Sequence, residues 1–225
     1  MRCAVIGAGA WGTALAELLA TNGHETIIWA FESDVADAIN RSRENPRFLP
    51  GYELASTLRA TADHGEALLA ASLVVYATPS HHLRQIVSQG KACLAPNAIL
   101  LVATKGIERG THALMTSVVE TEAFEHAVVG LSGPSFAEEV IAKQPTAIVA
   151  ASTNVAAANV AQAALSSSSF RVYTHDDVIG VELGGALKNV MAVATGIVEG
   201  VGLGYNSRAA LITRGLHEMT RLGVA

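Results

Sequence analysis

Three glycines near the start of the chain have the spacing of a dinucleotide-binding turn. Gly7, Gly9 and Gly12 form a Gly-x-Gly-x-x-Gly pattern between a short apolar run and a helical pattern. In such a turn the first glycine permits a tight bend, the second lets the backbone approach a pyrophosphate, and the third allows close packing of a helix whose N-terminal amides attract anions. The pattern alone is weak evidence, but here strand, turn, helix and second strand follow within about 30 residues. We therefore expect a bound nucleotide rather than a simple turn.

The end of the second predicted strand bears on the choice of cofactor. A carboxylate there would meet the ribose hydroxyls of NADH, whereas an arginine would meet the 2′-phosphate of NADPH. Glu32 lies about 20 positions after Gly12, and no arginine or lysine occurs between Gly12 and Arg41. This favours NADH. The alternative is that Glu32 or Asp34 only caps the next helix.

Two lysines have settings that suit the reduction of a carbonyl group. Hydride transfer leaves negative charge on the carbonyl oxygen, and a cation or acid must stabilise and protonate it. Lys105 ends a predicted strand, where open α/β sheets bind ligands, and Lys188 lies in an apolar helical segment that would partly desolvate its ammonium group. Alternatively, Lys105 is a solvated loop residue and Lys188 extends to solvent at a helix end.

Other side chains near these segments could either contact a ligand or serve only the fold. Ser135 follows a predicted strand and could offer its hydroxyl to a ligand, act as a helix N-cap, or do both. Trp11 and Phe31 could flank the adenine or the pyrophosphate, or pack in the core. His81 and His82 suggest a metal, but adjacent helical positions point in different directions and no carboxylate or cysteine completes a site, so we expect no metal.

The elements that must position these residues alternate along the chain. Strands are predicted near 3–6, 26–29, 73–77, 99–103, 127–131, 147–150 and 171–173. Helices are predicted at 11–21, 34–43, 83–94, 112–121, 135–143 and 155–165. The strands are mostly continuous apolar runs, which are typical of a parallel sheet buried on both faces. The pattern predicts an α/β fold with a Rossmann-like, doubly wound and mostly parallel sheet.

The strand pattern stops near residue 175, and helices broken around 200–206 follow. We expect a dinucleotide-binding domain at 1–175 and the start of an all-helical substrate or catalytic domain at 176–225. The second part is too short to close a core of its own, so we expect the chain to be truncated.

The composition fits a cytoplasmic enzyme. Half of the 225 residues are hydrophobic, 16% are charged and the formal net charge is −5, which is unlike a disordered or nucleic-acid-binding chain. No secretory signal is evident, and Glu199 with several glycines interrupts the apolar stretch from Val190, so no membrane insertion is expected. Cys3 and Cys93 have no metal or disulfide spacing and are both interpreted as core thiols.

Five stretches carry a family resemblance in order along the chain: GAGAWGTALA, VVYATPSHHL, LVATKGIERG, VGLSGPSFAEEV and VELGGALKNVMAVATGIVEGVGLGYNSRAALITRGLHEM. Together they resemble the bacterial type of NAD(P)-dependent glycerol-3-phosphate dehydrogenase. The resemblance implies interconversion of dihydroxyacetone phosphate and sn-glycerol 3-phosphate with NAD(P)H, for glycerophospholipid synthesis.

The resemblance also assigns roles to individual residues. It implies that Lys188 exchanges a proton with the substrate oxygen and that Lys105, also counted as catalytic, contacts both substrate and nicotinamide. The implied cofactor-binding residues are Gly7, Gly9, Ala10, Trp11, Gly12, Phe31, Pro79, Lys105 and Ala137. The implied substrate-binding residues are Lys105, Gly133, Ser135, Lys188 and Asn189.

The resemblance is incomplete at the C-terminal end. The family binds the substrate phosphate mainly through a later segment with an aspartate and a Ser-Arg-Asn motif, which this sequence lacks, and neither Arg208 nor Arg214 is assigned in its place. The sequence therefore leaves open whether this chain is active and whether it forms a homodimer. Two alternative functions also stay open. The alternatives are a related two-domain hydroxy-acid or sugar-acid dehydrogenase and a non-catalytic module that senses dinucleotides.

Overall fold

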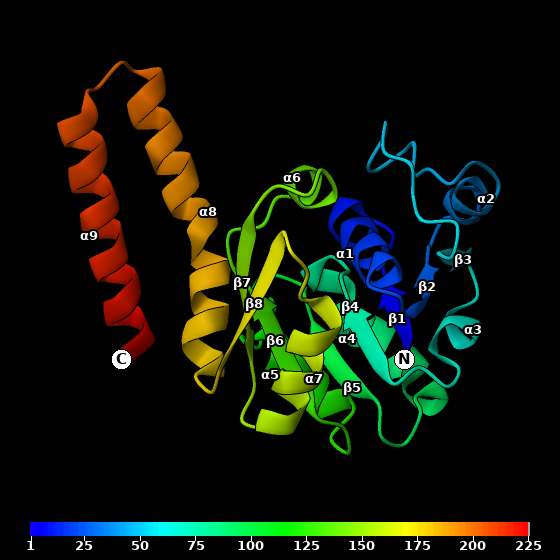
Figure 1. The fold of residues 1–225 in the computed structure, drawn as a ribbon. Helices are drawn as coiled ribbons and strands as arrows, with labels where there is room; N and C mark the ends of the chain where they lie inside the picture. The colour runs from blue at the N-terminus through cyan, green and yellow to red at the C-terminus, as the bar shows by residue number, and fades with distance from the viewer. Residues whose placement is uncertain (225) are drawn as a thin grey trace.

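The computed structural model describes residues 1–224 and has one eight-stranded sheet with helices on both faces, followed by a helical hairpin (Figure 1). The strands are β1 (Arg2–Ile6), β2 (Glu25–Trp29), β3 (Arg59–Thr61), β4 (Leu73–Tyr76), β5 (Ile99–Val102), β6 (Val128–Ser132), β7 (Thr146–Ala151) and β8 (Phe170–His175). Their order across the sheet is β3-β2-β1-β4-β5-β6-β7-β8. The first six strands follow the order of a Rossmann fold.

Parallel pairing dominates the sheet, as the sequence predicts. β1 pairs with β2 from Arg2 opposite Glu25 to Ile6 opposite Trp29, and all pairs are parallel except β6 with β7. The side chains of β1 from Cys3 to Ile6 are fully buried. Burial on both faces explains why the strand sequences are uninterrupted apolar runs.

The helices form two layers, each with its own apolar core. The helices are α1 (Ala10–Thr21), α2 (Ser33–Ser42), α3 (His64–Leu68), α4 (Ser80–Gly90), α5 (Met115–Glu122), α6 (Ala137–Ile141), α7 (Val155–Leu165), α8 (Val178–Gly200) and α9 (Tyr205–Val224). α1, α2 and α7 pack on one face of the sheet, and α3, α4 and α5 pack on the other. A short 3₁₀ turn, η1 (Lys91–Cys93), follows α4.

Several sequence expectations differ from the structure. β3 and α3 were not predicted, since three and five residues are too few to show a period. α5 begins at Met115 rather than at 112, because Gly110 and His112 have φ values of 88° and 59° and turn the chain first. Cys93 is exposed, so its interpretation as a core thiol is wrong, whereas Cys3 is buried and burial raises the pKa of its thiol to about 11.

α8 and α9 form an antiparallel hairpin that projects from the edge of the sheet (Figure 1). The carboxylate of Asp177 accepts a hydrogen bond from the Gly180 amide at 2.8 Å and caps α8. The first half of α8 packs against β6 and β7, whereas Val190, Val193 and Ile197 in its second half are exposed. The sheet therefore positions only the beginning of the hairpin.

By length and composition alone, α8 could cross a membrane. Its first half, however, carries a buried carboxylate at Glu182 and packs on the sheet. Core helices of globular proteins pass the same length and composition test. The absence of membrane insertion stays a prediction.

Candidate functional site

The turn between β1 and α1 is closed by contacts that require glycine at two positions. Gly7 has a φ of 115°, and a Cβ there would lie 2.8 Å from the carbonyl oxygen of Ala77. A Cβ on Gly12 would overlap the carbonyl oxygen of Gly7, so α1 packs directly onto the turn. A Cβ on Gly9 would meet nothing within 4 Å. Space at Gly9, together with the free amides at the start of α1, fits an anionic group.

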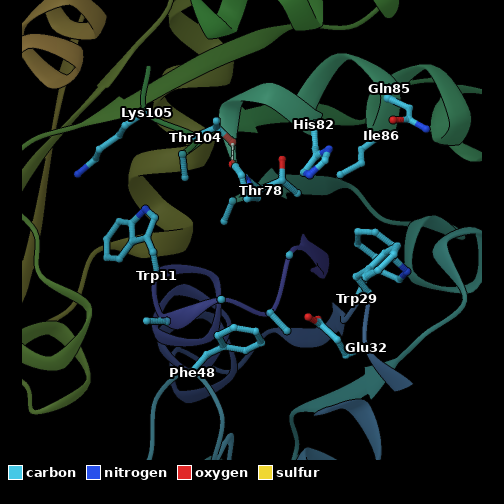
Figure 2. Close-up of a pocket in the computed structure, with 18 of the residues that line it drawn as sticks. Trp11, Trp29, Glu32, Phe48, Thr78, His82, Gln85, Ile86, Thr104 and Lys105 are labelled. Atoms are coloured by element: carbon cyan, nitrogen blue, oxygen red, sulfur yellow. Dashed lines mark hydrogen bonds between the residues drawn. The ribbon is translucent and has the colours of Figure 1, made fainter. Parts of the chain in front are cut away.

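A cleft of about 860 Å³ opens beside this turn, at the carboxyl ends of β1, β2, β4 and β5 (Figure 2). It lies between β1 and β4, where the strand order reverses and where open α/β sheets bind nucleotides. Of the predicted cofactor residues, those that line the cleft are Gly7, Gly9, Ala10, Trp11, Phe31, Pro79 and Lys105. Gly12 lies beneath the turn, and neither Gly12 nor Ala137 lines the cleft.

Glu32 lies at one end of the cleft, directly after β2 (Figure 2). It occupies the N-cap position of α2, but its carboxylate accepts no capping hydrogen bond. Instead, Glu32 Oε1 lies 3.6 Å from Arg47 Nη2. Phe31 beside it is 81% exposed, with its ring edge-on to Trp29. A carboxylate that lines the cleft and makes no capping hydrogen bond suits the ribose hydroxyls of a dinucleotide.

The loop after α2 contributes a cleft residue that the sequence analysis missed. Asn45 is fully buried and donates hydrogen bonds to the Ala8 carbonyl at 2.8 Å and to Thr13 Oγ1 at 2.9 Å. Its side-chain oxygen accepts a bond from the Phe48 amide at 3.1 Å. Asn45 thus ties the loop to the glycine turn and holds Phe48 at the cleft.

Lys105 lies at the opposite end of the cleft from Glu32 (Figure 2). Its ammonium group donates to the Gly133 carbonyl at 3.3 Å and to Ser135 Oγ at 3.2 Å, and lies 5.5 Å from the centre of the Trp11 ring. Burial, together with the neighbouring Lys188, lowers the pKa of Lys105 to about 8. The alternative of a solvated loop lysine is therefore wrong, because this ammonium group is partly desolvated and held by two hydrogen bonds.

The position of Trp11 bears on whether its ring packs in the core or contacts a ligand. Its ring packs against the core and lines the cleft at the Lys105 end, far from Glu32 (Figure 2). Packing in the core and contact with a ligand are thus compatible for Trp11. The indole Nε1 is buried without a hydrogen-bond partner among the described residues. A buried donor of this kind is usually matched to an acceptor, which is consistent with a ligand at this end.

α8 brings Lys188 to the same end of the molecule. Glu182 is buried, and its carboxylate accepts hydrogen bonds from the Thr116 amide at 3.1 Å and from the Thr116 hydroxyl. Burial raises the pKa of Glu182. A Cβ on Gly185 would overlap Ser132 Oγ, so this glycine allows α8 to approach the end of β6. One turn later, the half-buried Lys188 lies beside Lys105.

The surroundings of Lys188 differ in part from expectation. Its ammonium group lies 5.8 Å from the centre of the Phe136 ring. Asn189, the next residue, is exposed, and neither residue lines the cleft itself. The structure therefore joins Lys188, Lys105, Gly133 and Ser135, but leaves Asn189 outside this cluster.

Ser135 is not a helix cap. α6 begins at Ala137, two residues later than predicted, and its N-cap residue is Phe136, without a side-chain hydrogen bond. The Ser135 hydroxyl instead accepts a bond from Lys105 and donates to the Gly133 carbonyl at 3.3 Å. The hydroxyl lines the cleft and is available to a ligand.

The paired histidines behave differently from expectation but form no metal site. The rings of His81 and His82 lie 4.0 Å apart, so the expectation that they point apart is wrong. His82 lines the cleft. Within residues 1–224 no group of three or more histidine, cysteine, aspartate or glutamate side chains could hold a metal ion.

Comparisons with known proteins match this geometry. Two family models, described as the N-terminus and the C-terminus of NAD-dependent glycerol-3-phosphate dehydrogenase, match residues 2–158 and 177–225. The chain is 50% identical over 228 residues to glycerol-3-phosphate dehydrogenase [NAD(P)+] of Trichlorobacter lovleyi, and 48% identical over 227 residues to that of Myxococcus xanthus. Each alignment covers all of this chain and 68% of the relative.

Solved structures agree with the sequence comparisons. Glycerol-3-phosphate dehydrogenase from Coxiella burnetii superimposes with a TM-score of 0.91 at 41% identity, over 98% of this chain and 68% of that chain. A structure titled DsGPDH of Dunaliella salina gives a TM-score of 0.91 at 26% identity, over 99% of this chain and 41% of that chain.

Proposed function

Because this chain belongs to the NAD-dependent glycerol-3-phosphate dehydrogenase family, we propose that its cleft binds a nicotinamide dinucleotide with the adenosine at Glu32 and the nicotinamide at Lys105. The protein is an oxidoreductase with NAD(P)H as its cofactor. The observation that carries the proposed orientation is that the glycine turn divides the cleft, with an acidic end at Glu32 and a cationic end at Lys105, beside which Lys188 lies.

The residues of the glycine turn would bind the pyrophosphate. Gly9 offers backbone without a side chain, and the first amides of α1 have no acceptor within the helix. Phe48 and Trp29 would add apolar contacts at the adenosine end, where both line the cleft. When bound, the reduced nicotinamide supplies the hydride.

Lys188 and Lys105 would perform the chemistry on the substrate. As hydride adds to the carbonyl carbon of dihydroxyacetone phosphate, negative charge develops on the oxygen. Lys188 donates a proton to that oxygen and becomes a neutral amine, which completes the alcohol of glycerol 3-phosphate. Lys105 stabilises the same charge, and its contacts with Ser135 and the Gly133 carbonyl hold its ammonium group in place.

A substrate panel tests this proposal. In a version extended to the length of the relatives, we expect oxidation of NADH or NADPH with dihydroxyacetone phosphate, and far slower oxidation with hydroxypyruvate or 2-ketogluconate. Preference for a hydroxy-acid or sugar-acid substrate would support the related two-domain dehydrogenase instead. Coenzyme binding without turnover, in a version extended to the length of the relatives, would support the dinucleotide-sensing module.

We further propose a domain boundary near residue 176, with residues 1–175 binding the dinucleotide and residues 176–225 supplying the catalytic lysine. Supply of glycerol 3-phosphate to phospholipid synthesis in the cytoplasm, without membrane insertion, is part of the same proposal. A homodimer stays a prediction, which sedimentation velocity would test.

A further inference from the structure

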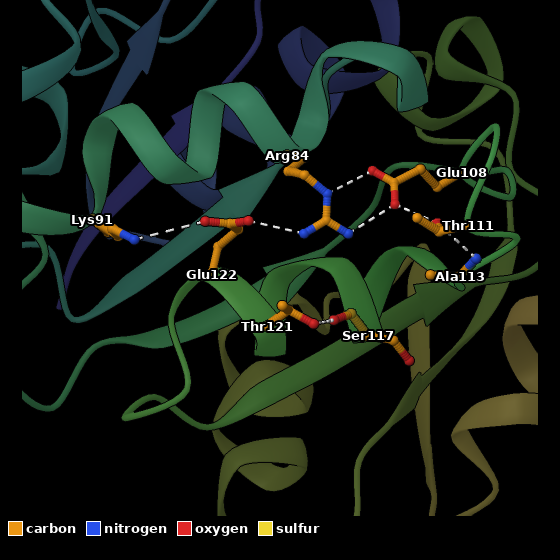
Figure 3. A network of polar contacts seen from close by, with 8 residues as sticks. All are labelled: Arg84, Lys91, Glu108, Thr111, Ala113, Ser117, Thr121 and Glu122. Atoms are coloured by element: carbon orange, nitrogen blue, oxygen red, sulfur yellow. Dashed lines mark hydrogen bonds and ion pairs between the residues drawn. The ribbon is translucent and has the colours of Figure 1, made fainter.

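Arg84 joins two carboxylates on the side of α4 that faces away from the cleft (Figure 3). Its Nε and Nη2 atoms donate to the two oxygens of Glu108 at 2.8 and 2.7 Å, and its Nη1 atom donates to Glu122 Oε1 at 2.8 Å. Lys91 Nζ lies 3.7 Å from the second oxygen of Glu122. We call these four residues the Arg84 cluster. The cluster links α4, the loop after β5 and the end of α5.

Glu108 anchors the loop that begins with Lys105. Its carboxylate also accepts a bond from the Thr111 hydroxyl at 2.5 Å, and its backbone amide donates to the Ala113 carbonyl at 2.9 Å. A β-bridge between Ile107 and Leu114 closes the base of the loop. The loop is thus a compact unit, and Glu108 is its attachment to α4.

Between Lys105 and Glu108 the chain is short and passes close to the start of α4. Gly106 has a φ of 142°, and a Cβ there would lie 3.1 Å from Ser80, the first residue of α4. Because only Gly106 and Ile107 separate the two residues, a shift of Glu108 would displace the backbone next to Lys105. On the opposite side of α4, the cleft is lined by His82, Gln85, Ile86 and Gln89.

We propose that Arg84 is a positioning residue: by holding Glu108, it keeps the Lys105 ammonium group in register with the cleft wall that α4 forms. This inference rests on the proposed role of Lys105. The cluster touches neither the cleft nor the reacting atoms, so Arg84 acts only through Glu108 and Lys105.

The charge pattern supports a rigid link. A guanidinium group that donates two parallel bonds to one carboxylate fixes both distance and angle. The side chains of Glu108 and Glu122 are 14% and 17% exposed, and that of Arg84 is 35% exposed. The bonds from Arg84 lower the pKa of Glu108 to about 2. The pair consequently stays charged at any pH where the protein would work.

The test is the titration of Lys105 in the intact chain. The protein has only four lysines, Lys91, Lys105, Lys143 and Lys188, so trace acylation followed by mass spectrometry resolves each one. In the wild type we expect Lys105 reactivity to rise with a midpoint near pH 8. In Glu108→Gln the midpoint moves upward toward the ordinary 10.5, because a released loop lets the ammonium group reach water. NADH binding weakens by roughly tenfold, as expected for the loss of about one charge-assisted contact.

Matched variants separate positioning from general stability. Glu218→Gln removes a carboxylate that likewise joins two charged partners, Arg214 and Arg221, but on α9; its Lys105 midpoint and NADH affinity stay at wild-type values. Arg84→Lys keeps the charge without the two-pronged geometry, and its Lys105 midpoint lies between those of the wild type and Glu108→Gln. Arg84→Lys also serves as the test if Glu108→Gln does not fold.

The outcomes are distinct. A Lys105 midpoint that is the same in Glu108→Gln and Arg84→Lys as in Glu218→Gln would overturn the inference. Failure of the proposed role of Lys105 itself would give a different result. Lys105→Ala would then leave turnover and NADH affinity unchanged, whatever the labelling shows.

Discussion

Lys105 lies at one end of the cleft with a second like charge, Lys188, beside it, and among residues 1–224 no carboxylate forms an ion pair with either ammonium group. Repulsion and burial act together, and they lower the pKa of Lys105 to about 8. A site arranged in this way favours a ligand that brings negative charge. A phosphorylated ketone and the developing oxyanion of its reduction both fit that requirement.

The first prediction at this scale concerns Lys188. In a version extended to the length of the relatives, we expect Lys188→Ala to lower kcat by about 10²- to 10⁴-fold, the range for removal of a general acid, and to leave NADH affinity nearly unchanged because Lys188 does not line the cleft. Steady-state kinetics and NADH fluorescence titration measure the two effects. Lys143→Gln, at an exposed lysine, is the control. Ordinary turnover by the alanine variant would remove Lys188 from the mechanism.

A second prediction concerns stability. A lysine whose pKa is lowered on folding binds its proton less tightly in the folded state, so stability rises with pH between about 8 and 10.5. Below pH 8, the charged form destabilises the fold. We therefore expect Lys105→Met to raise the free energy of unfolding at pH 7 by roughly 1–2 kcal/mol, discounted because the group is partly solvated.

Urea unfolding of the wild type and Lys105→Met at pH 7 and at pH 9.5 tests whether the variant is the more stable protein. The gain from Lys105→Met should be smaller at pH 9.5, where the wild-type lysine is already largely neutral in the folded state. A destabilised Lys105→Met protein at pH 7 would show that the contacts with Gly133 and Ser135 outweigh the burial of the charge.

Glu32 carries the third prediction. Because its carboxylate faces the cleft and would repel a 2′-phosphate, we expect the wild type to bind NADH more tightly than NADPH. Glu32→Gln should narrow the difference by roughly tenfold, since it removes one repulsive charge. Asp34→Asn is a neighbouring control. Tighter binding of NADPH by the wild type would indicate that Arg47, 3.6 Å from Glu32, binds the phosphate instead.

At the scale of elements, the turn from β1 into α1 contains one glycine that the packing requires, Gly12, and one that would leave space for a ligand, Gly9. Gly12→Ala forces a methyl group into the Gly7 carbonyl, and we expect the free energy of unfolding to fall by about 1–3 kcal/mol from overpacking.

Gly9→Val meets no protein atom near its Cβ, so we expect the free energy of unfolding to stay unchanged while NADH binding is lost. Thermal unfolding and coenzyme titration of both variants test the contrast. A stable Gly9→Val protein that still binds NADH would contradict the assigned pyrophosphate site.

The elements that could be predicted from the sequence are those with local signals. The glycine spacing, the apolar runs of β1 and β4, and the helical pattern of α1 each lie within one segment, and the structure confirms them. Asn45, Glu182 and the Arg84 cluster depend on partners far along the chain, such as Thr13, Thr116 and Glu108. No periodicity marks such contacts, so their roles emerge only from the fold.

The site residues divide in the same way. Gly9 and Lys105 were predicted because each lies three residues after the end of a strand, at the carboxyl edge of the sheet. Phe48 was missed because it lies in a loop without a pattern, and only the buried Asn45 brings it to the cleft. Lys188 could be placed beside Lys105 only through the family resemblance, since the approach of α8 depends on Gly185 and Ser132.

At the scale of the whole molecule, the sheet and the helical hairpin each contribute one lysine to the same cluster. The sheet provides the cleft and Lys105, and α8, which packs against β6 and β7, brings Lys188 beside Lys105 (Figure 1). The chain covers 68% of the length of its Trichlorobacter lovleyi and Myxococcus xanthus relatives. In the function we propose, the substrate would bind where the two parts of the chain meet, and the dinucleotide would bind to the first part.

The direction in which the coenzyme lies is the central claim, and a crystal structure with bound NADH measures it most directly. We predict the pyrophosphate at Gly9, the adenosine ribose at Glu32, and the nicotinamide ring beside Trp11 and Lys105. A cleft that side chains fill, or a coenzyme with its nicotinamide at Glu32, would contradict the account.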